Sequence, residues 1–486
     1  MKCYPSLAQA KSYEASFTTI PISRTIPLEK RSATDILAIL QQVSKHCFLL
    51  ESCEDSKNWG RYSFLGFDPS LEITMLGEDL CIRSGTELHL KAEKPHPYLR
   101  KILSENRSPL VEGLPPFTGG LVGYFSYDFI AYSEPVLRLD AEDEEGFNDL
   151  DLMLFDKLIA IDNLEQKIFL IVNIKRNDIE TSYSKGVLAL QNMEYLLTQH
   201  TEPKLEKHGR LLGPLVPLFS KDEYCTMVEK AKKHIYDGDI FQVVLSNRLV
   251  APYEGSLKQV YAALRQMNPS PYMFYFSSDE IEIAGASPET LVKLEDRKLS
   301  TFPLAGTKPR GRDKAEDDRL ETELLTDEKE KAEHTMLVDL GRNDIGKISC
   351  FGSVNVEKYM KVEKFSHVMH LGSTVTGTLR DDLDSLDAID SILPAGTLSG
   401  APKIRACQLI NELEHNKRGI YGGAIGYLSF SGGLDTCIAI RLAFKKHGKV
   451  YVRSGAGIVA DSVPEKEHQE CLNKAQAVIN ALEEEA

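Results

Sequence analysis

Three apolar runs near the C-terminus, IGYLSF, CIAIRLAFK and KVYVRSG, are separated by turns at Ser-Gly-Gly and His-Gly. Turns this short join antiparallel neighbours, because a parallel pair needs a crossover of about a dozen residues. Further short alternating runs, divided by Gly or Asp turns, extend from Arg61 to about Asn173. Strands and helices do not alternate strictly, so the sequence favours an α+β fold over a doubly wound parallel sheet.

Helix signals are strongest in the second half of the chain. Ser220 and Glu223 form a capping box that opens an amphipathic helix. Segment 316–341 is predicted to be one helix that ends at Gly341, and Pro464 is typical of the first turn of a helix. The sequence therefore predicts long helices among the strands of this half.

A polar, Pro-containing stretch at residues 200–217 is the best candidate for a linker. We therefore expect an N-terminal domain at 1–215 and a second domain at 216–486. With 486 residues, 42% of them apolar, the chain can bury a large core.

The charge balance excludes several classes of function. A net charge of −15 does not fit the clustered Lys and Arg of a nucleic-acid-binding protein, and an anionic substrate would need a local Arg or metal ion. No apolar run approaches the roughly 18 residues of a membrane helix, and the N-terminus lacks the order of a signal peptide. Nine scattered cysteines without a C-x-x-C pair indicate reduced thiols. We expect a cytoplasmic protein that binds neither membranes nor nucleic acid.

Small residues dominate PAGTLSGAPKIRA, residues 394–406, which indicates close approach of the backbone to another group. A second Gly-rich run, GAGIVA at 455–460, matches the dinucleotide-binding fingerprint by its letters. That fingerprint requires a helix to open at once, whereas residues 461–464 intervene here. We interpret the run as a strand end whose N–H groups bind an anion such as a carboxylate.

Two segments predicted to be helical carry E-x-x-E, Glu330/Glu333 and Glu467/Glu470. A spacing of three places both carboxylates on one helical face. Facing pairs would form an oxygen-only site of the kind Mg²⁺ prefers. Two solvated acidic faces are the alternative in a chain with 72 acidic residues.

Arg441 and His370 each stand alone in an apolar run. A buried guanidinium needs a partner, which could be an internal carboxylate or an anionic ligand. His370 fits either a core histidine or a site residue. The hydroxyls of Tyr421 and Thr397 lie in the small-residue stretches, where they could face a ligand.

Five motifs together resemble the chorismate-utilising enzymes. They are FPLAGTKPRG (302–311), EHTMLVDLGRNDIGK (333–347), SHVMHLGSTVTG (366–377), PAGTLSGAPK (394–403) and VRSGAGIVADSVPEKEHQE (452–470). The resemblance is dense from about 220 to 480 and extends back to LLES at 49–52. It implies large antiparallel sheets packed face to face, with helices outside and two intertwined subdomains.

Two positions distinguish the reactions within this family. Isochorismate and salicylate synthases carry a water-activating Lys where this chain has Gln242, which cannot deprotonate water. Aminodeoxychorismate synthases carry a Lys where this chain has Ala305, so the covalent route is closed. The resemblance then implies the anthranilate synthase reaction, a Mg²⁺-dependent lyase step. Aminodeoxychorismate synthase component I and a catalytically silent metabolite-binding subunit remain the alternatives.

The resemblance also implies roles for individual residues. Glu289 would be the general acid, assisted by His370 and Thr397. Mg²⁺ would be held by Glu333 and Glu470, supported by Glu330 and Glu467. Chorismate would be bound by Gly306, Thr307, Tyr421, Arg441, Ala456, Gly457 and Lys474.

The ammonia source and the regulation follow from the same resemblance. No cysteine has the G-x-C-x-G surroundings of a glutaminase nucleophile, so a separate glutamine amidotransferase subunit is implied, commonly as two copies of each chain. Tryptophan is expected as a feedback inhibitor. Its candidate ligands are Ser52, Pro271, Tyr272 and Met273, although Asn-Pro-Ser-Pro at 268–271 also fits a stiff lead-in to a strand.

Overall fold

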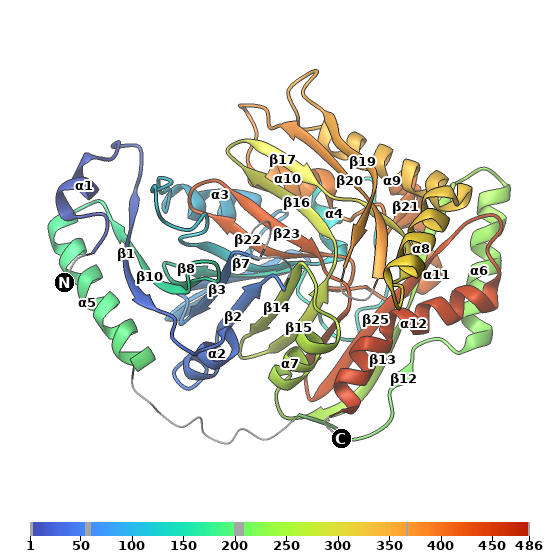
Figure 1. Cartoon of the computed structure of the whole chain (residues 1–486), viewed down its shortest axis with the longest axis horizontal. Helices are drawn as coiled ribbons and strands as arrows, with labels where there is room; N and C mark the ends of the chain where they lie inside the picture. The colour runs from blue at the N-terminus through green and yellow to red at the C-terminus, as the bar shows by residue number, and fades with distance from the viewer. Residues whose placement is uncertain (1–2, 54–59, 199–208, 366–367, 485–486) are drawn as a thin grey trace.

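Two large antiparallel sheets form the body of the protein, and helices lie on the outside (Figure 1). The structure is a computed structural model that describes residues 3–53, 60–198, 209–365 and 368–484. The predicted α+β class is confirmed. Much of the candidate linker, residues 200–208, lies outside the described residues.

Sheet 1 has 13 strands. Their spatial order is β1 (Thr19–Pro27), β10 (Lys167–Lys175), β9 (Lys157–Asp162), β3 (Tyr62–Phe67), β2 (Cys47–Glu51), β14 (Tyr272–Ser277), β15 (Ile281–Ser287), β24 (Leu442–Lys446), β25 (Lys449–Ile458), β13 (Gln242–Glu254) and β11 (Arg210–Leu211), with β12 (Val216–Pro217) and β21 (Gly400–Ala401) also paired to β13.

Sheet 2 has 12 strands. Their order is β18 (Leu304–Pro309), β20 (Val368–Thr378), β17 (Lys298–Thr301), β16 (Thr290–Glu295), β23 (Leu434–Ile438), β22 (Ala424–Ser429), β7 (Gly120–Phe125), β8 (Leu150–Phe155), β4 (Leu71–Leu76), β5 (Asp79–Ser84) and β6 (Thr86–Lys91), with β19 (Asn355–Lys364) paired to β20.

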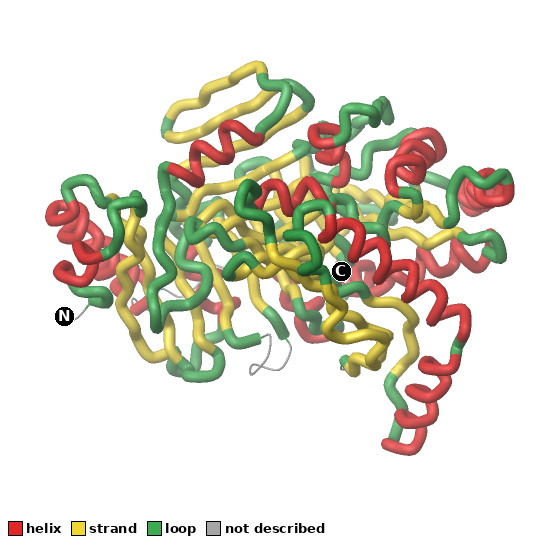
Figure 2. The backbone as a smooth tube through the Cα atoms, turned by 90° about the horizontal axis from the view of Figure 1, so that it is seen from above, coloured by secondary structure: helices red, strands yellow, loops and turns green. Residues whose placement is uncertain are grey.

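The helices surround the two sheets (Figure 2). They are α1 (Leu7–Ser12), α2 (Ala33–Leu40), α3 (His96–Ser104), α4 (Ile130–Ser133), α5 (Ile179–Thr198), α6 (Lys221–Tyr236), α7 (Lys258–Met267), α8 (Lys314–Thr326), α9 (Glu328–Gly346), α10 (Ser385–Ile392), α11 (Lys403–Glu414) and α12 (Pro464–Glu483), with a 3₁₀ turn at Tyr127–Phe129. None of the helices in the described residues is long and apolar enough to span a bilayer.

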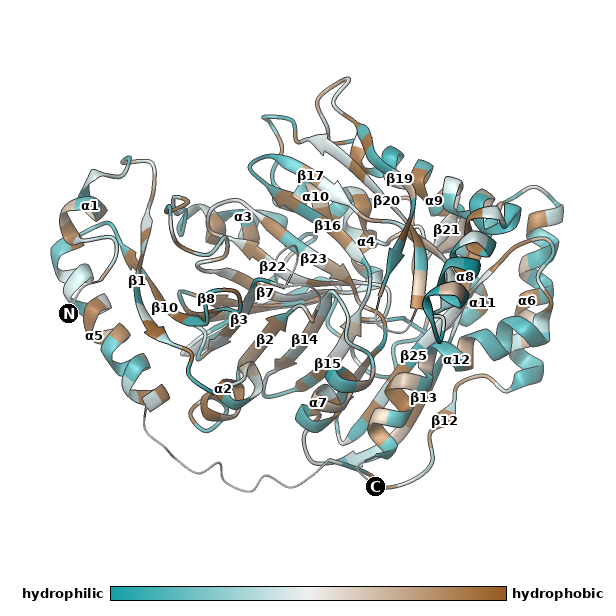
Figure 3. Cartoon of the chain, viewed as in Figure 1, coloured by the Kyte–Doolittle hydropathy of each residue, from teal (hydrophilic) through white to brown (hydrophobic). Residues whose placement is uncertain are grey.

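The core is layered. Apolar side chains of both sheets meet in a cluster that includes Phe48, Phe274, Tyr124, Phe155 and Ile425, so the sheets pack face to face as predicted. The other face of sheet 1 packs against α2, α5, α7 and α12, and that of sheet 2 packs against α3, α9 and α10. Polar residues gather on outward surfaces such as that of α8 (Figure 3).

Each sheet consists of an N-terminal and a C-terminal block. In sheet 1 the strands up to β10 form one block, which joins the later strands where β2 pairs with β14. In sheet 2 the two blocks join where β7 pairs with β22. We call these two junctions the seams. The two parts of the chain are therefore intertwined, and β11, which precedes residue 215, pairs with β13 of the later part.

The chain passes from one sheet to the other at a corner that two segments share. Residues 288–289 connect β15 of sheet 1 to β16 of sheet 2, and residues 439–441 connect β23 of sheet 2 to β24 of sheet 1. The prediction that CIAIRLAFK is one strand is therefore wrong. The strand breaks at Arg441, whose φ of 50° lies in the left-handed region, because its two halves pair in different sheets.

The prediction of one helix over 316–341 is also wrong. The helix is interrupted at Asp327, whose side chain accepts hydrogen bonds from the backbone N–H groups of Lys329 and Glu330 and so caps α9. The helix then continues past Gly341 to Gly346. The capping box at Ser220 and the helix start at Pro464 are confirmed.

Candidate active site

Glu289 and Arg441 lie on the two segments of the shared corner. The Ile438 N–H donates to the Glu289 carbonyl at 3.0 Å, and the Ala286 N–H donates to the Arg441 carbonyl at 3.1 Å. These bonds connect the two segments directly. Residues 152 positions apart in the sequence are thus held beside each other by the change of sheet.

Glu289 is a buried carboxyl with one hydrogen bond from a neutral partner. The Thr397 hydroxyl donates to its Oε1 at 3.1 Å, and the residue is 8% exposed. Burial raises the pKa of Glu289 to about 8, against the lowering effects of Thr397, Arg441 and Lys474. The side chain is therefore protonated at neutral pH and can donate a proton.

The small-residue segment around Thr397 packs tightly against the protein itself. A Cβ added at Gly400 would lie 2.2 Å from the Gln242 carbonyl oxygen, and one at Gly396 would lie 2.7 Å from Leu340 Cδ1. The sequence predicted that this backbone lies close to another group, and that group is β13 and α9 of the protein itself. It fixes the backbone that presents Thr397 to Glu289.

A buried ionic network supports this segment, and the sequence reasoning missed it. The Glu414 carboxylate accepts from Arg418 Nε and Arg453 Nη2, each at 3.0 Å, and from the Ser246 N–H at 2.7 Å. Arg418 also donates to the carbonyls of Leu398 and Val244, each at 2.6 Å. Glu414 and Arg418 stand four residues apart in a charged helix end, so the sequence pattern resembled solvated surface.

The glutamates of the two E-x-x-E pairs lie on α9 and α12, and Glu470 is close enough to the other three to act on them electrostatically. Burial raises the pKa of Glu330, Glu333 and Glu467, and the charge of Glu470 raises all three further. Lys474 pairs with Glu470 at 2.8 Å, one helical turn away. Mutual repulsion among oxygen-only donors fits a site for Mg²⁺, although their ligand atoms form no set within 4.8 Å of one another in the described structure.

Gly306 connects these acids to His370. Its φ of 63° lies at a bulge in β18, and an added Cβ would stand 3.0 Å from Glu330 Oε2. His370 Nδ1 lies 2.7 Å from the Gly306 carbonyl oxygen and 3.1 Å from the Thr307 hydroxyl. Burial lowers the pKa of His370, so the imidazole is neutral. With its proton on Nδ1, its Nε2 can accept a hydrogen bond.

Strand β25 supplies the remaining candidates. Ala456 and Gly457 pair with β13, and a Cβ on Gly457 would lie 2.7 Å from the Gln242 amide nitrogen. A Cβ on Gly455 would lie 3.0 Å from the Tyr421 hydroxyl. The run is a strand that ends at Ile458, followed by a turn before α12, which agrees with our rejection of the dinucleotide fingerprint.

The structure thus brings together site residues that were predicted from widely separated segments of the sequence. Thr397, Arg441 and Lys474 all act on Glu289, and Lys474 pairs with Glu470. Glu470 faces Glu330, which lies against Gly306. Contacts and short-range electrostatic effects therefore connect the corner to the acidic helices.

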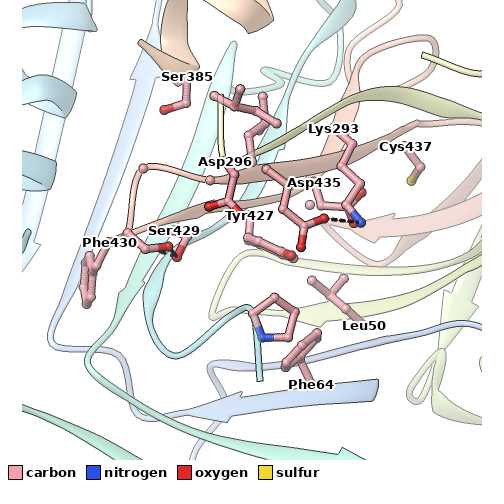
Figure 4. Close-up of a pocket in the computed structure, with 18 of the residues that line it drawn as sticks. Leu50, Phe64, Lys293, Asp296, Ser385, Tyr427, Ser429, Phe430, Asp435 and Cys437 are labelled. Carbon is pink, nitrogen blue, oxygen red and sulfur yellow. Dashed lines mark hydrogen bonds and ion pairs between the residues drawn. The ribbon is translucent and has the colours of Figure 1, made fainter. Parts of the chain in front are cut away.

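The four tryptophan candidates lie elsewhere, around a cavity of about 890 Å³ between the sheets. Ser52, Pro271, Tyr272 and Met273 line it from the seam of sheet 1. Tyr427 and Ser429 of β22 line it from the seam of sheet 2 (Figure 4). The Tyr272 hydroxyl lies 2.9 Å from both Thr290 Oγ1 and Asp435 Oδ1. Tyr272, which lines the cavity, thus contacts the residue that follows Glu289 in the chain.

Comparison with known proteins defines the class first. A family model described as chorismate binding enzyme matches residues 45–480, so the chain belongs to the chorismate-binding enzyme family. A structure titled anthranilate synthase component I, from Streptococcus pneumoniae TIGR4, has a TM-score of 0.75 at 39% identity, covering 86% of this chain and 92% of that one. A menaquinone-specific isochorismate synthase from Escherichia coli shares the fold, with a TM-score of 0.71 at 21% identity over 98% of both chains.

Within this family, the relatives with similar sequences are named anthranilate synthase component 1. Anthranilate synthase component 1 of Acetivibrio thermocellus is 44% identical, and the match covers 99% of both chains. The protein of the same name from Aquifex aeolicus (strain VF5) is 41% identical, over 98% of this chain and 97% of that one. The similarity therefore extends over the whole fold.

Proposed function

We propose that the protein is the chorismate-converting subunit of an anthranilate synthase. In this reaction chorismate and ammonia give anthranilate, pyruvate and water, as a lyase step of tryptophan synthesis. The observation that carries the proposal is the buried Glu289 carboxyl, protonated at neutral pH and placed beside Thr397, Arg441 and the acidic helices. Whole-chain similarity to proteins named anthranilate synthase component 1 supports the same reaction.

Glu289 would supply the proton that lets the 4-hydroxyl of the ring leave as water, while ammonia adds at C2. The carboxylate that remains would be stabilised by the Thr397 hydroxyl and by the charges of Arg441 and Lys474. The neutral His370 would accept a hydrogen bond through Nε2 and orient the leaving group. Loss of pyruvate then gives the aromatic ring.

Binding of a dicarboxylate by a chain with a net charge of −15 requires local positive groups. Arg441, the Tyr421 hydroxyl and the N–H groups of Ala456 and Gly457 would hold the enolpyruvyl carboxylate. Gly306 and Thr307 would contact the ring near the acidic helices.

Glu333 and Glu470 would hold Mg²⁺, with Glu330 and Glu467 supporting them. The ion would neutralise the ring carboxylate of chorismate. The raised pKa values of Glu330, Glu333 and Glu467 support this role, because a divalent cation relieves the repulsion among them.

Ammonia would come from a glutamine amidotransferase subunit, since the chain lacks a glutaminase cysteine motif. Tryptophan would bind the cavity at the seams through Ser52, Pro271, Tyr272 and Met273. The hydrogen bond between Tyr272 and Thr290, the neighbour of Glu289, offers a short route from effector to catalysis.

The test is to mix the pure protein with chorismate, Mg²⁺ and an ammonium salt and to follow anthranilate fluorescence together with pyruvate. We expect both products in equal amounts and their loss on addition of EDTA. An aminated product without pyruvate would indicate aminodeoxychorismate synthase instead. No product in either assay would contradict the enzyme proposal, and normal Mg²⁺-dependent activity of Glu470→Gln would contradict the metal role of Glu470.

A further inference from the structure

The hairpin formed by β5 and β6 ends sheet 2 at the edge opposite β18, which carries Gly306 and Thr307. Its register pairs Cys81 with His89, and the pleat places alternate residues on opposite faces. Asp79, Cys81, Arg83, Glu87, His89 and Lys91 therefore share one face. The opposite face carries Leu80, Ile82 and Leu90, which pack into the core.

Three different ligand types converge on the polar face. Cys81 Sγ lies 3.3 Å from Glu87 Oε1, and His89 Nε2 lies 3.2 Å from the same oxygen. One ligand atom from each residue lies within 4.8 Å of the other two. Within the described residues this is the one such set of three potential metal ligands, and nothing in the proposed reaction uses it.

We infer that Cys81, Glu87 and His89 form a Zn²⁺ site, with the sulfur, a carboxylate oxygen and Nε2 as ligands and water in a fourth, tetrahedral position. Thiolate and imidazole ligands favour Zn²⁺ over Mg²⁺. The site is separate from the all-oxygen cluster on α9 and α12. It would fasten the exposed outer strand β6 to β5.

Asp79 provides an independent indication of a metal ligand. Its carboxylate lies 3.3 Å from His89 Nδ1, on the side of the ring away from Cys81 and Glu87. Zinc-binding histidines commonly donate their second ring N–H to a carboxylate, which fixes the tautomer and directs the other nitrogen to the metal.

Arg83, a cation on the same face, contacts the cluster directly, with Nε 3.2 Å from Glu87 Oε1. Its Nη1 and Nη2 also contact Glu72 and Glu280, each at 3.2 Å. These two acids can hold the guanidinium in place when Glu87 turns toward a metal ion. The charge of Arg83 then remains paired with Glu72 and Glu280.

Cobalt(II) is the probe, because a Co²⁺–thiolate bond gives a charge-transfer absorption that carboxylates cannot give. We expect the reduced full-length protein to show this band at one Co²⁺ per chain, to lose it when Zn²⁺ is added, and to keep it in excess Mg²⁺. Absence of the band would overturn the proposal.

Substitutions in β5 and β6 test whether the Co²⁺–thiolate band arises from this hairpin. Cys81→Ser should abolish it, His89→Asn should weaken Co²⁺ binding more than tenfold, and Asp79→Asn should weaken it by about tenfold. The matched control is Cys350→Ser, a partly exposed thiol on another element, which should keep the band. Anthranilate formation should be normal in all four variants. A band that survives in Cys81→Ser would refute the site.

Discussion

Two buried glutamates within the same half of the molecule show opposite behaviour. Glu414 contacts Arg418 and Arg453, and these cations lower its pKa although it is fully buried. Glu289 forms no ion pair with any described residue, and burial raises its pKa to about 8. Glu414 therefore stays charged because two arginines contact it. Glu289 stays neutral because its nearest cations do not form an ion pair with it.

The difference separates two roles that a sequence cannot distinguish. The charged Glu414 connects α11, β13 and β25, and its partner Arg418 holds the Thr397 segment through the Leu398 carbonyl. The neutral Glu289 retains a proton that it can give away. The first residue contributes to structure, whereas the second contributes to the reaction.

The largest effect is expected for Glu289→Gln. An amide of the same shape cannot donate a proton to the leaving hydroxyl, so kcat for anthranilate formation should fall by about 10² to 10⁴. The thermal midpoint at pH 7 should stay the same or rise, because the amide keeps the Thr397 hydroxyl as a partner. A kcat close to that of the parent protein would remove Glu289 from the proton transfer.

Glu414→Gln should act on stability instead. Removing one partner from a buried ionic network leaves two guanidinium groups without their counter-charge, which costs about 3–5 kcal/mol. Urea unfolding measures the loss. Glu412→Gln, an exposed change on the same helix, is the control and should cost well under 1 kcal/mol. A loss equally small for both variants would mean that water replaces the network.

The pH dependence of stability should have opposite sign at the two sites. Because the pKa of Glu289 is raised, its contribution to the free energy of unfolding is greatest at low pH. That contribution is lost as the pH rises from about 4.5 to about 8. The pKa of Glu414 is lowered, so its contribution is present at neutral pH and is lost as the pH falls below the ordinary glutamate range.

Thermal midpoints of Glu289→Gln and of the parent protein at pH 5.5 and 8.5 test this sign. The variant should gain relative to the parent at the higher pH, where the parent must bury a charge. An unchanged difference between the two pH values would show that Glu289 is ionised throughout this range.

The smallest effect on the uninhibited enzyme is expected at the seam cavity. Ser52→Phe should relieve inhibition by tryptophan, because the larger side chain enters the cavity, while the rate without tryptophan changes little. Initial rates over a tryptophan series measure this. Normal inhibition of the variant would mean that the effector binds elsewhere.

The sequence predicted the fold class and two helix starts, because caps and hydrophobic periods are local signals. Ser220 and Pro464 begin helices as expected. The break at Arg441 could not be predicted, because an apolar run does not tell which sheet each half will join. The partners of Glu414 were missed for a related reason, since Arg453 reaches it only through tertiary pairing.

The two seams have a consequence for synthesis on the ribosome. Strands β2 and β7 are the N-terminal strands at the two seams. Their partners β14 and β22 lie much later in the chain and are therefore translated much later. Until then, CFLLE and GLVGYF present unpaired, largely apolar edges, which are templates for aggregation. A nascent chain halted before β22 should therefore depend on chaperones, and release of the complete chain should end that dependence.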